Sequence, residues 1–330
     1  MSRLPTFDDV HHAAARIAAS VKKTPVLTSK DLNDRTGGRI FLKAECLQKT
    51  GSFKFRGATN KLLQLTESER AAGVVAWSTG NHAQGVAAAA KALGVSAKIV
   101  MPSDAPQTKL GGTRSHGAKV VFYDRATDDR EEIGRRIARE EGRTVVPPYD
   151  DFDIICGQGT AGLELVDQVT ELDATLDDVL VPASGGGLLA GVSLAVHGHF
   201  PEAQFFVVEP RSFDDHKRSL DSGHRESNAL ATGSICDALL APTPGTLTWQ
   251  VNCTRLTGGY AVTDEEVLDA IAFAYHTFDI RLEPGGAVAL AALLNGCHDA
   301  AGRSVALILS GSNVDDDTFN RALARLPTGT

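Results

Sequence analysis

Apolar segments of strand length alternate with helical segments along much of this chain, and short turns rich in glycine, serine or asparagine join them. The clearest unit starts with an apolar run at 73–77, turns at 78–81, and continues into an alanine-rich helix from about His82 to Leu93, which Gly94 ends. Buried strands that alternate with helices are typical of a mostly parallel sheet covered on both faces. The sequence therefore predicts an α/β fold.

Further units of the same kind lie on both sides of residue 150. Strands are expected at 40–43, 97–101, 119–123, 179–182, 204–208 and 305–309, and helices at 107–116, 128–141 and 188–196. We predict a small domain of residues 71–151, inserted into a large domain of residues 1–70 and 152–330. The polar segment 211–227 is expected to be a mobile loop.

Composition excludes several classes of protein. The net charge of -8 argues against nucleic-acid binding, which usually leaves a basic surface. No apolar run approaches the roughly 18 residues of a membrane span, and Asp8 and Asp9 stand where a signal peptide has its apolar core. The five cysteines form no C-x-x-C pair, so we expect small buried side chains without a disulfide or zinc framework. A cytoplasmic protein without a membrane or nucleic-acid partner is the expectation.

Lys54 lies between two aromatic residues in a glycine-bounded segment, 51–57 (GSFKFRG). A lysine amine normally keeps its proton up to a pKa of about 10.4, but apolar neighbours and a nearby cation disfavour the charged form. A neutral amine can attack a carbonyl, so Lys54 is a candidate for a Schiff base. The alternative is a surface lysine whose stem packs at the start of a helix.

A glycine-rich turn follows the expected strand at 179–182 and opens a helix, where backbone amides and the helix dipole can bind a phosphate. Its residues are Ser184, Gly185, Gly186, Gly187 and Leu188. Glycines at a close strand-to-helix crossing are one alternative. The spacing of this turn with Ala190, and Glu209 about 20 residues further on, also fits the dinucleotide loop of an NAD-binding dehydrogenase. That interpretation gives the reactive lysine no role, so we favour a phosphate site.

Three other turns carry polar side chains. The turn of Ser78, Thr79, Asn81 and His82 opens a helix, where a substrate carboxylate can bind, although His82 fits a capping or packing role better than that of a general base. Ser310 begins an ordinary strand-end turn. Glu283 precedes a proline at a helix start, where a carboxylate can simply cap the helix.

The segment 49–58 (KTGSFKFRGA) resembles the cofactor-lysine motif of the serine/threonine dehydratase and serine racemase family, which are pyridoxal-phosphate enzymes of fold type II. The resemblance runs from about residue 23 to residue 315, through several motifs in the family's order. It implies two open, twisted, mostly parallel sheets flanked by helices in a large and a small domain. It also implies pyridoxal 5'-phosphate as the cofactor and a small amino acid as the substrate, and we expect a homodimer.

The resemblance also implies a role for each motif. The turn of 184–188 would hold the cofactor phosphate, and the turn of 78–82 would hold the substrate. The residues expected to contact the cofactor ring are Phe53, Lys54, Asn81 at the phenolic oxygen, Glu283, and Ser310 at the ring nitrogen. Family racemases have serine at the Thr79 position and threonine dehydratases have alanine. A hydroxyl there can deliver a proton opposite Lys54, so Thr79 is a candidate catalytic residue.

Two charged segments remain. The segment 209–215 carries three carboxylates, and the resemblance implies a structural Mg²⁺ or Ca²⁺ bound by Glu209, the carbonyl of Phe213, and Asp215. A solvated acidic loop is the alternative. Arg130 stands where family members that act on hydroxyaspartate or bind dicarboxylates have arginine, and a guanidinium can grip a second carboxylate. Alternatively, Arg130 is exposed and pairs with an acid of its own helix.

We therefore predict a lyase that dehydrates and deaminates serine, threonine or 3-hydroxyaspartate to a 2-keto acid and ammonia. A serine or aspartate racemase on the same scaffold is the main alternative. A dehydrogenase that binds NAD, and a protein that binds a cofactor or nucleotide without catalysis, are the others.

Overall fold

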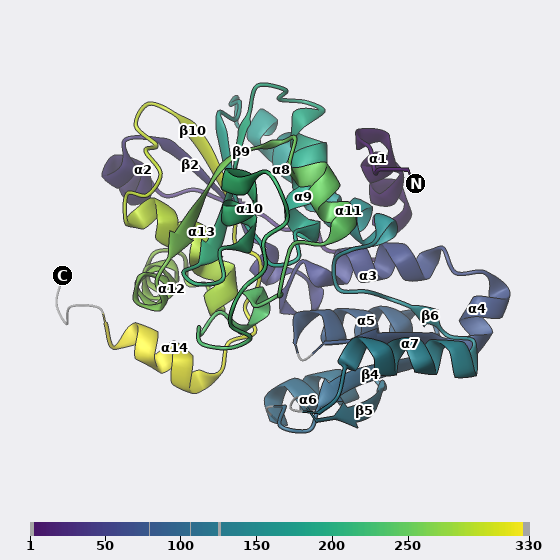
Figure 1. The fold of residues 1–330 in the computed structure, drawn as a ribbon. Coiled ribbons are helices and arrows are strands. Elements are labelled where there is room, and N and C mark those ends of the chain that lie inside the picture. Colours follow the sequence, from purple (N-terminus) through teal and green to yellow (C-terminus); the bar gives the residue numbers. More distant parts are fainter. Residues whose placement is uncertain (1–2, 79, 106, 125–126, 326–330) are drawn as a thin grey trace.

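The computed structural model describes residues 3–78, 80–105, 107–124 and 127–325, and in these residues the strands form two sheets wrapped by helices (Figure 1). The six-stranded sheet has the order β1-β2-β10-β7-β8-β9, in which only the β1–β2 pair is antiparallel. The four-stranded sheet has the order β5-β4-β3-β6 and is parallel throughout. The predicted α/β fold class is confirmed.

The strands of the larger sheet are β1 (Val26–Leu27), β2 (Arg39–Lys43), β7 (Asp178–Pro182), β8 (Gln204–Pro210), β9 (Leu256–Val262) and β10 (Ser304–Ile308). The strands of the smaller sheet are β3 (Val74–Trp77), β4 (Ala97–Pro102), β5 (Lys119–Tyr123) and β6 (Thr144–Val145).

The α-helices are α1 (Phe7–Ile17), α2 (Lys30–Thr36), α3 (Lys54–Leu63), α4 (Glu67–Ala72), α5 (Asn81–Ala92), α6 (Gln107–Ser115), α7 (Arg130–Glu141), α8 (Phe152–Glu171), α9 (Gly187–His197), α10 (Asp215–Ser222), α11 (Thr246–Asn252), α12 (Asp264–Phe278), α13 (Pro284–Leu294) and α14 (Asp316–Leu323). Short 3-10 helices are η1 (Glu45–Leu47), η2 (Lys49–Gly51) and η3 (Asp237–Leu239). Among these described helices, none has both the length and the apolar character needed to cross a bilayer.

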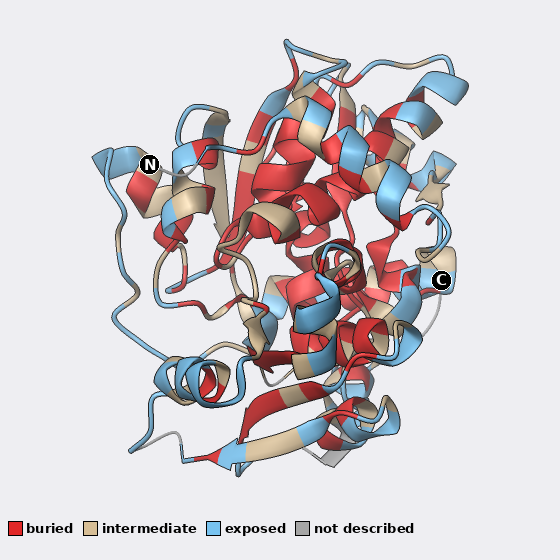
Figure 2. Cartoon of the chain, turned by 90° about the vertical axis from the view of Figure 1, so that its right-hand side faces the viewer, coloured by how far each residue is buried: buried red, intermediate tan, exposed pale blue. Residues whose placement is uncertain are grey.

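The larger sheet joins the two ends of the chain, because β2 lies between β1 and β10 and pairs with β10 in parallel register. Side chains alternate between the two faces of a strand. Ile40 and Leu42 pack in the cluster formed with α12 and α13, whereas Phe41 packs in the cluster formed with α8 and α9. Both faces are therefore buried, and Figure 2 shows the buried residues concentrated inside this part of the molecule.

The smaller sheet is covered in the same way. Val74 and Ala76 face the cluster that includes α5, and Val75 and Trp77 face α7. Gly134 allows α7 to approach, since a Cβ there would lie 2.4 Å from the Trp77 ring. On this topology we propose the division into a large domain (1–70 and 152–330) and a small domain (71–151).

The segment 211–227 differs from its prediction as a mobile loop, because α10 forms within it. The Glu209 carboxylate accepts hydrogen bonds from the backbone amides of His216 and Lys217, at 3.0 and 2.9 Å. These two amides lie in the first turn of α10, where no intrahelical acceptor exists, so a carboxylate from β8 supplies one. A buried partner outside the helix thus stabilises a segment whose polar composition does not suggest a helix.

A buried ion network fixes the start of α3. The Arg56 guanidinium donates to both Glu45 carboxylate oxygens, at 2.7 and 2.8 Å, and to both oxygens of Glu164, at 2.7 and 2.8 Å. Lys43 donates to the same Glu164 carboxylate at 2.8 Å. The network joins α3 to β2, η1 and α8, and so holds Lys54, two residues before Arg56, against the larger sheet.

Replacing Arg56 by methionine should lower the free energy of unfolding by about 3–5 kcal/mol, because two acids then lose their buried partner. Urea denaturation monitored by circular dichroism measures the loss. Arg139→Met is the matched control, since Arg139 forms an exposed ion pair with Glu132 and its loss should cost less than about 1 kcal/mol. Equal effects of the two substitutions would contradict the stabilising role of the network.

Candidate active site

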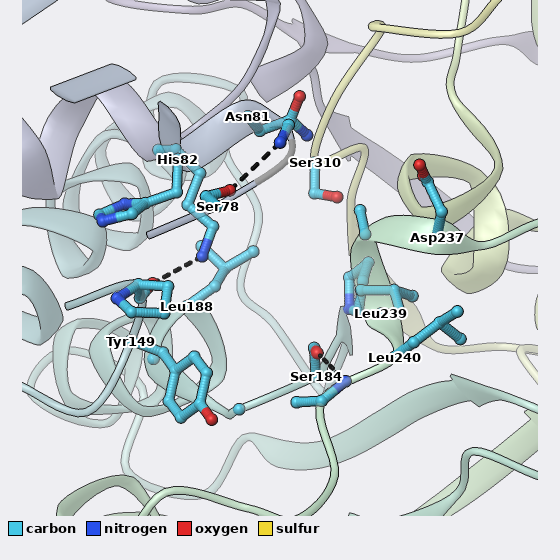
Figure 3. A pocket seen from close by; sticks show the side chains of 18 of the residues that line it. Ser78, Asn81, His82, Tyr149, Ser184, Leu188, Asp237, Leu239, Leu240 and Ser310 are labelled. Atoms are coloured by element: carbon cyan, nitrogen blue, oxygen red, sulfur yellow. Dashed lines mark hydrogen bonds between the residues drawn. The ribbon is translucent and has the colours of Figure 1, made fainter. Parts of the chain in front are cut away.

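One pocket collects the residues that follow three parallel strands. Ser78 follows β3, Ala183 follows β7 and Ser310 follows shortly after β10, and all three line this pocket. Ligand sites of open α/β sheets lie outside the carboxyl ends of the strands, where the loops converge. Figure 3 shows Tyr149 and Ser184 on one side of the pocket and Asn81 and Ser310 on the other.

The Lys54 side chain lies at the start of α3 and reaches into the pocket, where its Nζ donates to the Pro148 carbonyl at 2.7 Å. The Phe53 ring lies beside it, with its centroid 5.1 Å from Nζ. Burial lowers the pKa of the Lys54 amine to about 8, and the negative charge of Glu283 opposes the shift. Of the two causes that the sequence suggested, the apolar surroundings are the one that lowers this pKa, and about a tenth of the amine is then neutral at pH 7.

Glu283, Asn81 and Asn313 form a chain of side-chain hydrogen bonds across the pocket. The Asn81 amide donates to Glu283 Oε1 at 2.5 Å and its oxygen accepts from Asn313 at 2.8 Å. Burial and the charge of Asp237 raise the pKa of Glu283 to about 7. Gly311 leaves room for this group, since a Cβ there would lie 2.1 Å from Glu283 Oε1 and would displace the carboxylate. Glu283 is therefore a pocket residue as well as the residue before α13.

The glycine-rich turn presents its amides to the pocket because its carbonyls are held from the opposite side. Thr248 Oγ1 donates to the Gly185 carbonyl at 2.6 Å, and Asn252 Nδ2 donates to the Gly186 carbonyl at 3.3 Å. In a trans peptide the C=O and the following N–H point in opposite directions. The amides of Gly186 and Gly187 therefore point away from α11, at the N-terminus of α9, which suits an anion.

Tyr149 explains why the turn needs glycine. A Cβ on Gly185 would lie 2.2 Å from the Tyr149 ring, and one on Gly187 would lie 3.0 Å from the Tyr149 carbonyl. Ser184 Oγ accepts from the Ala241 amide at 3.0 Å, and Leu188 also lines the pocket. The turn is thus enclosed between the 147–151 linker and the η3 region.

The other predicted polar residues occupy different positions. Ser78 lines the pocket, and Thr79 lies outside the described residues. His82 lines the pocket, but its Nε2 is bound to the Val146 carbonyl at 2.8 Å, and burial lowers its pKa to about 3. This neutral ring fits the packing role better than that of a base. Ser310 is buried, and its hydroxyl lies 3.4 Å from the Gly285 carbonyl.

Arg130 is the first residue of α7 and lines the pocket. Asp129 caps the helix by accepting from the amides of residues 131 and 132, which places Arg130 at its first turn. Among the described residues, the ion pairs within α7 involve its other arginines, Arg135, Arg136 and Arg139. The guanidinium also lies near Tyr149, whose pKa burial raises to about 12 while Arg130 opposes that rise. Geometry thus favours a pocket role over pairing along its own helix.

Two of the predicted metal ligands form a buried acid pair. Glu209 and Asp215 are both fully buried, and burial together with the charge of Asp215 raises the pKa of Glu209 well above its usual range. Burial raises the pKa of Asp215 to about 7, and its Oδ2 has no hydrogen-bond partner among the described residues. The side chain of Phe213, two residues before Asp215, is also buried. In the described chain no three His, Cys, Asp or Glu side chains form a metal site, so a third ligand would have to be a carbonyl or water.

Glu209 also bears on the dinucleotide interpretation, which requires this acid to face a ribose. The carboxylate is instead buried against the first turn of α10 and does not line the pocket. Further pocket residues lie outside every motif of the sequence, among them Lys109, Pro148, Tyr149 and Asp237. Lys109 of α6 and Asp237 of η3 are joined by an ion pair across the pocket. No local motif marks them, because only the fold brings them together.

Comparisons with known proteins agree on one family. The family model described as "Pyridoxal-phosphate dependent enzyme" matches residues 17–311. L-threo-3-hydroxyaspartate ammonia-lyase of Pseudomonas sp is 41% identical over 96% of this chain and 98% of that protein. Serine racemase of Schizosaccharomyces pombe is 39% identical over 98% of each chain. The crystal structure of a threonine deaminase from T.th. has a TM-score of 0.88 and 41% identity, and the match covers 94% of this chain and 99% of that one.

The pKa of the Lys54 amine should fall further when its anionic neighbour is removed. Since Glu283 raises this pKa against the effect of burial, Glu283→Gln should move the midpoint of amine deprotonation below about 8. The rate of reductive methylation of Lys54 with formaldehyde and cyanoborohydride, followed by peptide mass spectrometry against pH, measures the midpoint. A midpoint that rises or stays unchanged in Glu283→Gln would contradict this electrostatic assignment.

Proposed function

This chain belongs to the pyridoxal-phosphate-dependent enzyme family, and from that premise we propose that it is an ammonia-lyase acting on a β-hydroxy-α-amino acid. The products are a 2-keto acid and ammonia. The observation that carries the proposal is the buried Lys54 amine in one pocket with the glycine-rich turn. Relatives named hydroxyaspartate and threonine ammonia-lyases support the reaction class.

The pocket residues fit pyridoxal phosphate. Lys54 would hold its aldehyde carbon through the amine, and the turn of 184–188 would hold its phosphate through the amides that face the pocket. A hydroxyl at Ser310 and a donor at Asn81 would meet the ring nitrogen and the phenolic oxygen. Phe53 and Glu283 complete the ring site. The low pKa of the amine, about 8, supports covalent attachment at Lys54.

The reaction needs three tasks from the chain. The α5 N-terminus, with Ser78, Asn81 and His82, binds the substrate carboxylate. The Lys54 amine, which reaches into the pocket, would take the α-proton of the bound substrate. The bound cofactor supplies an electron sink for the carbon that loses this proton. Ser310 offers a neutral partner to the ring, which limits delocalisation into the ring and favours loss of the β-hydroxyl over transamination.

Substrate choice rests on Arg130. Its guanidinium enters the pocket from α7 near Tyr149, whose high pKa keeps the phenol protonated as a donor. Both groups suit the second carboxylate of a dicarboxylic amino acid. We therefore propose 3-hydroxyaspartate as a substrate in addition to serine and threonine, in keeping with relatives named for hydroxyaspartate.

Racemisation is the second candidate activity, because several relatives are named serine racemase. It requires a proton donor on the face of the substrate opposite Lys54. Thr79 has the hydroxyl for this role, although its methyl group can displace the oxygen from the position that a serine hydroxyl takes. A substrate with a good β-leaving group will then lose it before a proton is returned.

We also propose a Mg²⁺ or Ca²⁺ at Glu209, Asp215 and the Phe213 carbonyl, as a structural ion. Two adjacent buried acids with raised pKa values are stabilised by a cation, and Asp215 Oδ2 has no other partner in the described chain. The homodimer and the cytoplasmic location expected from the sequence stay predictions.

Lys54→Ala should abolish formation of keto acid from every substrate, because both the covalent anchor and the base for the α-proton are lost. Keto acid release from serine, threonine and 3-hydroxyaspartate, coupled to a reductase, measures turnover. In the wild-type protein, borohydride should fix the cofactor on the Lys54 peptide. Elimination at the wild-type rate in the alanine variant would defeat the assignment.

Arg130→Ala should reduce kcat/KM for 3-hydroxyaspartate far more than for serine, by about 2 kcal/mol or more if a buried charge-assisted contact is lost. Arg136→Ala is the matched control, because this arginine pairs with Glu140 on the exposed face of the same helix. The ratio of kcat/KM for the two substrates should stay unchanged in that control. An equal loss on both substrates in Arg130→Ala would refute a dicarboxylate pocket.

A further inference from the structure

Three carbonyls of the glycine-rich turn, those of residues 184–186, determine where the amides of residues 185–187 point. The Gly185 carbonyl accepts from Thr248 and from the Gly245 amide, and the Gly186 carbonyl accepts from Asn252 and from the Ala190 amide of α9. These contacts together orient the amides of Gly186 and Gly187. The carbonyl of Ser184 sets the direction of the remaining amide, that of Gly185, by the same trans-peptide geometry.

The His216 ring lies directly beneath this turn. A Cβ on Gly186 would lie 2.7 Å from His216 Cε1, 2.9 Å from His216 Nε2 and 2.8 Å from Asn252 Nδ2. Gly186 has a φ of 92°, which side-chain-bearing residues rarely adopt. The imidazole and the Asn252 amide are therefore both in close contact with the backbone that forms the anion site.

The His216 side chain is fully buried, and neither of its ring nitrogens has a hydrogen-bond partner among the described residues. The Ser184 backbone lies beside the ring. An imidazole carries at least one N–H in either protonation state. Leaving such a donor buried without an acceptor costs roughly 1–3 kcal/mol, and the Ser184 backbone is the acceptor within its reach.

The position of the ring is itself fixed. The His216 amide donates to Glu209 Oε1 at 3.0 Å, and the next amide, of Lys217, donates to Oε2 at 2.9 Å. The first turn of α10 is thereby attached to the end of β8, which runs beside β7, the strand before the turn. These contacts thus fix the position of the imidazole relative to Ser184.

We propose that His216 is a positioning residue for the phosphate-binding turn: its ring N–H holds the Ser184 carbonyl, so that the Gly185 amide joins those of Gly186 and Gly187 in facing the cofactor phosphate. The inference rests on the proposed function, because it assigns the bound anion to pyridoxal phosphate. Thr248, His216 and Asn252 then form one layer of donors beneath the turn. None of the three touches the cofactor in this arrangement.

The test compares pyridoxal 5'-phosphate with pyridoxal, which lacks the phosphate. Both form the bond to Lys54, so the ratio of their dissociation constants reports on the turn alone. The full-length protein, freed of cofactor, is titrated with each compound by absorbance. His216→Phe removes the donor and keeps a ring, whereas His216→Gln keeps an N–H. Thr248→Val removes a donor whose contact is defined, and His298→Phe removes a buried imidazole elsewhere, beside Asp178.

His216→Phe should weaken binding of pyridoxal 5'-phosphate by about tenfold, the scale of one lost hydrogen bond to this site, and leave pyridoxal binding within about twofold. Thr248→Val should behave alike, and His298→Phe should change neither constant. The ³¹P chemical shift of the bound phosphate should move in His216→Phe and return toward the wild-type value in His216→Gln. Should the phenylalanine variant not fold, His216→Leu provides the same comparison.

If His216→Phe weakened the binding of both compounds equally, His216 would have only a packing role and the inference would be overturned. Unchanged affinity for pyridoxal 5'-phosphate together with an unchanged ³¹P shift would overturn it as well. A wild-type protein that binds neither compound at Lys54 would overturn the proposed function and the inference with it. Wild-type binding and keto acid formation, with no selective effect at His216, would overturn the inference alone.

Discussion

Burial of one amine in the same pocket as the glycine-rich turn is the constraint on which the site depends. The Lys54 amine loses hydration when the two sheets enclose it, and this lowers its pKa to about 8. Its Nζ is held by a backbone carbonyl, that of Pro148, rather than by an acid. A carboxylate at that distance would raise the pKa again and leave less of the amine in the neutral form that attacks a carbonyl. Glu283, the acid that does raise the pKa, accepts its hydrogen bond from Asn81 instead.

The rigidity of this arrangement comes from the elements beneath it. Arg56 anchors α3 through Glu45 and Glu164, with both ends of each contact largely removed from water. Such a network is costly to bury but leaves few alternative positions for the helix, since any displacement exposes unpaired charge. The turn of 184–188 is held in a comparable way by donors from α11. The groups that line the pocket are thus held in place by polar contacts that lie beneath them, outside the pocket.

Sequence patterns predict the parts of the structure that are local. The strand at 119–123 and the helix that begins near Asn81 follow from periodicity, and the glycine turn follows from its own residues. The helix α10 could not be predicted, because Glu209 stabilises it from a neighbouring strand. Tyr149 and Asp237 were not predicted for a related reason. Only the folded chain brings the linker of residues 147–151 and the 3-10 helix η3 to the pocket. Tertiary contacts, and not local propensity, place these residues.

The segment that links the two sheets joins the amine to the turn. His82 binds the Val146 carbonyl through its Nε2, and Lys54 donates to the Pro148 carbonyl two residues later. Asp150 then accepts from the amides of residues 246, 247 and 248 at the start of α11, the helix that holds the turn. The amine and the glycine-rich turn are therefore attached to the same short segment, the turn by way of α11. Because one segment holds both, its contacts set the position of the amine relative to the turn.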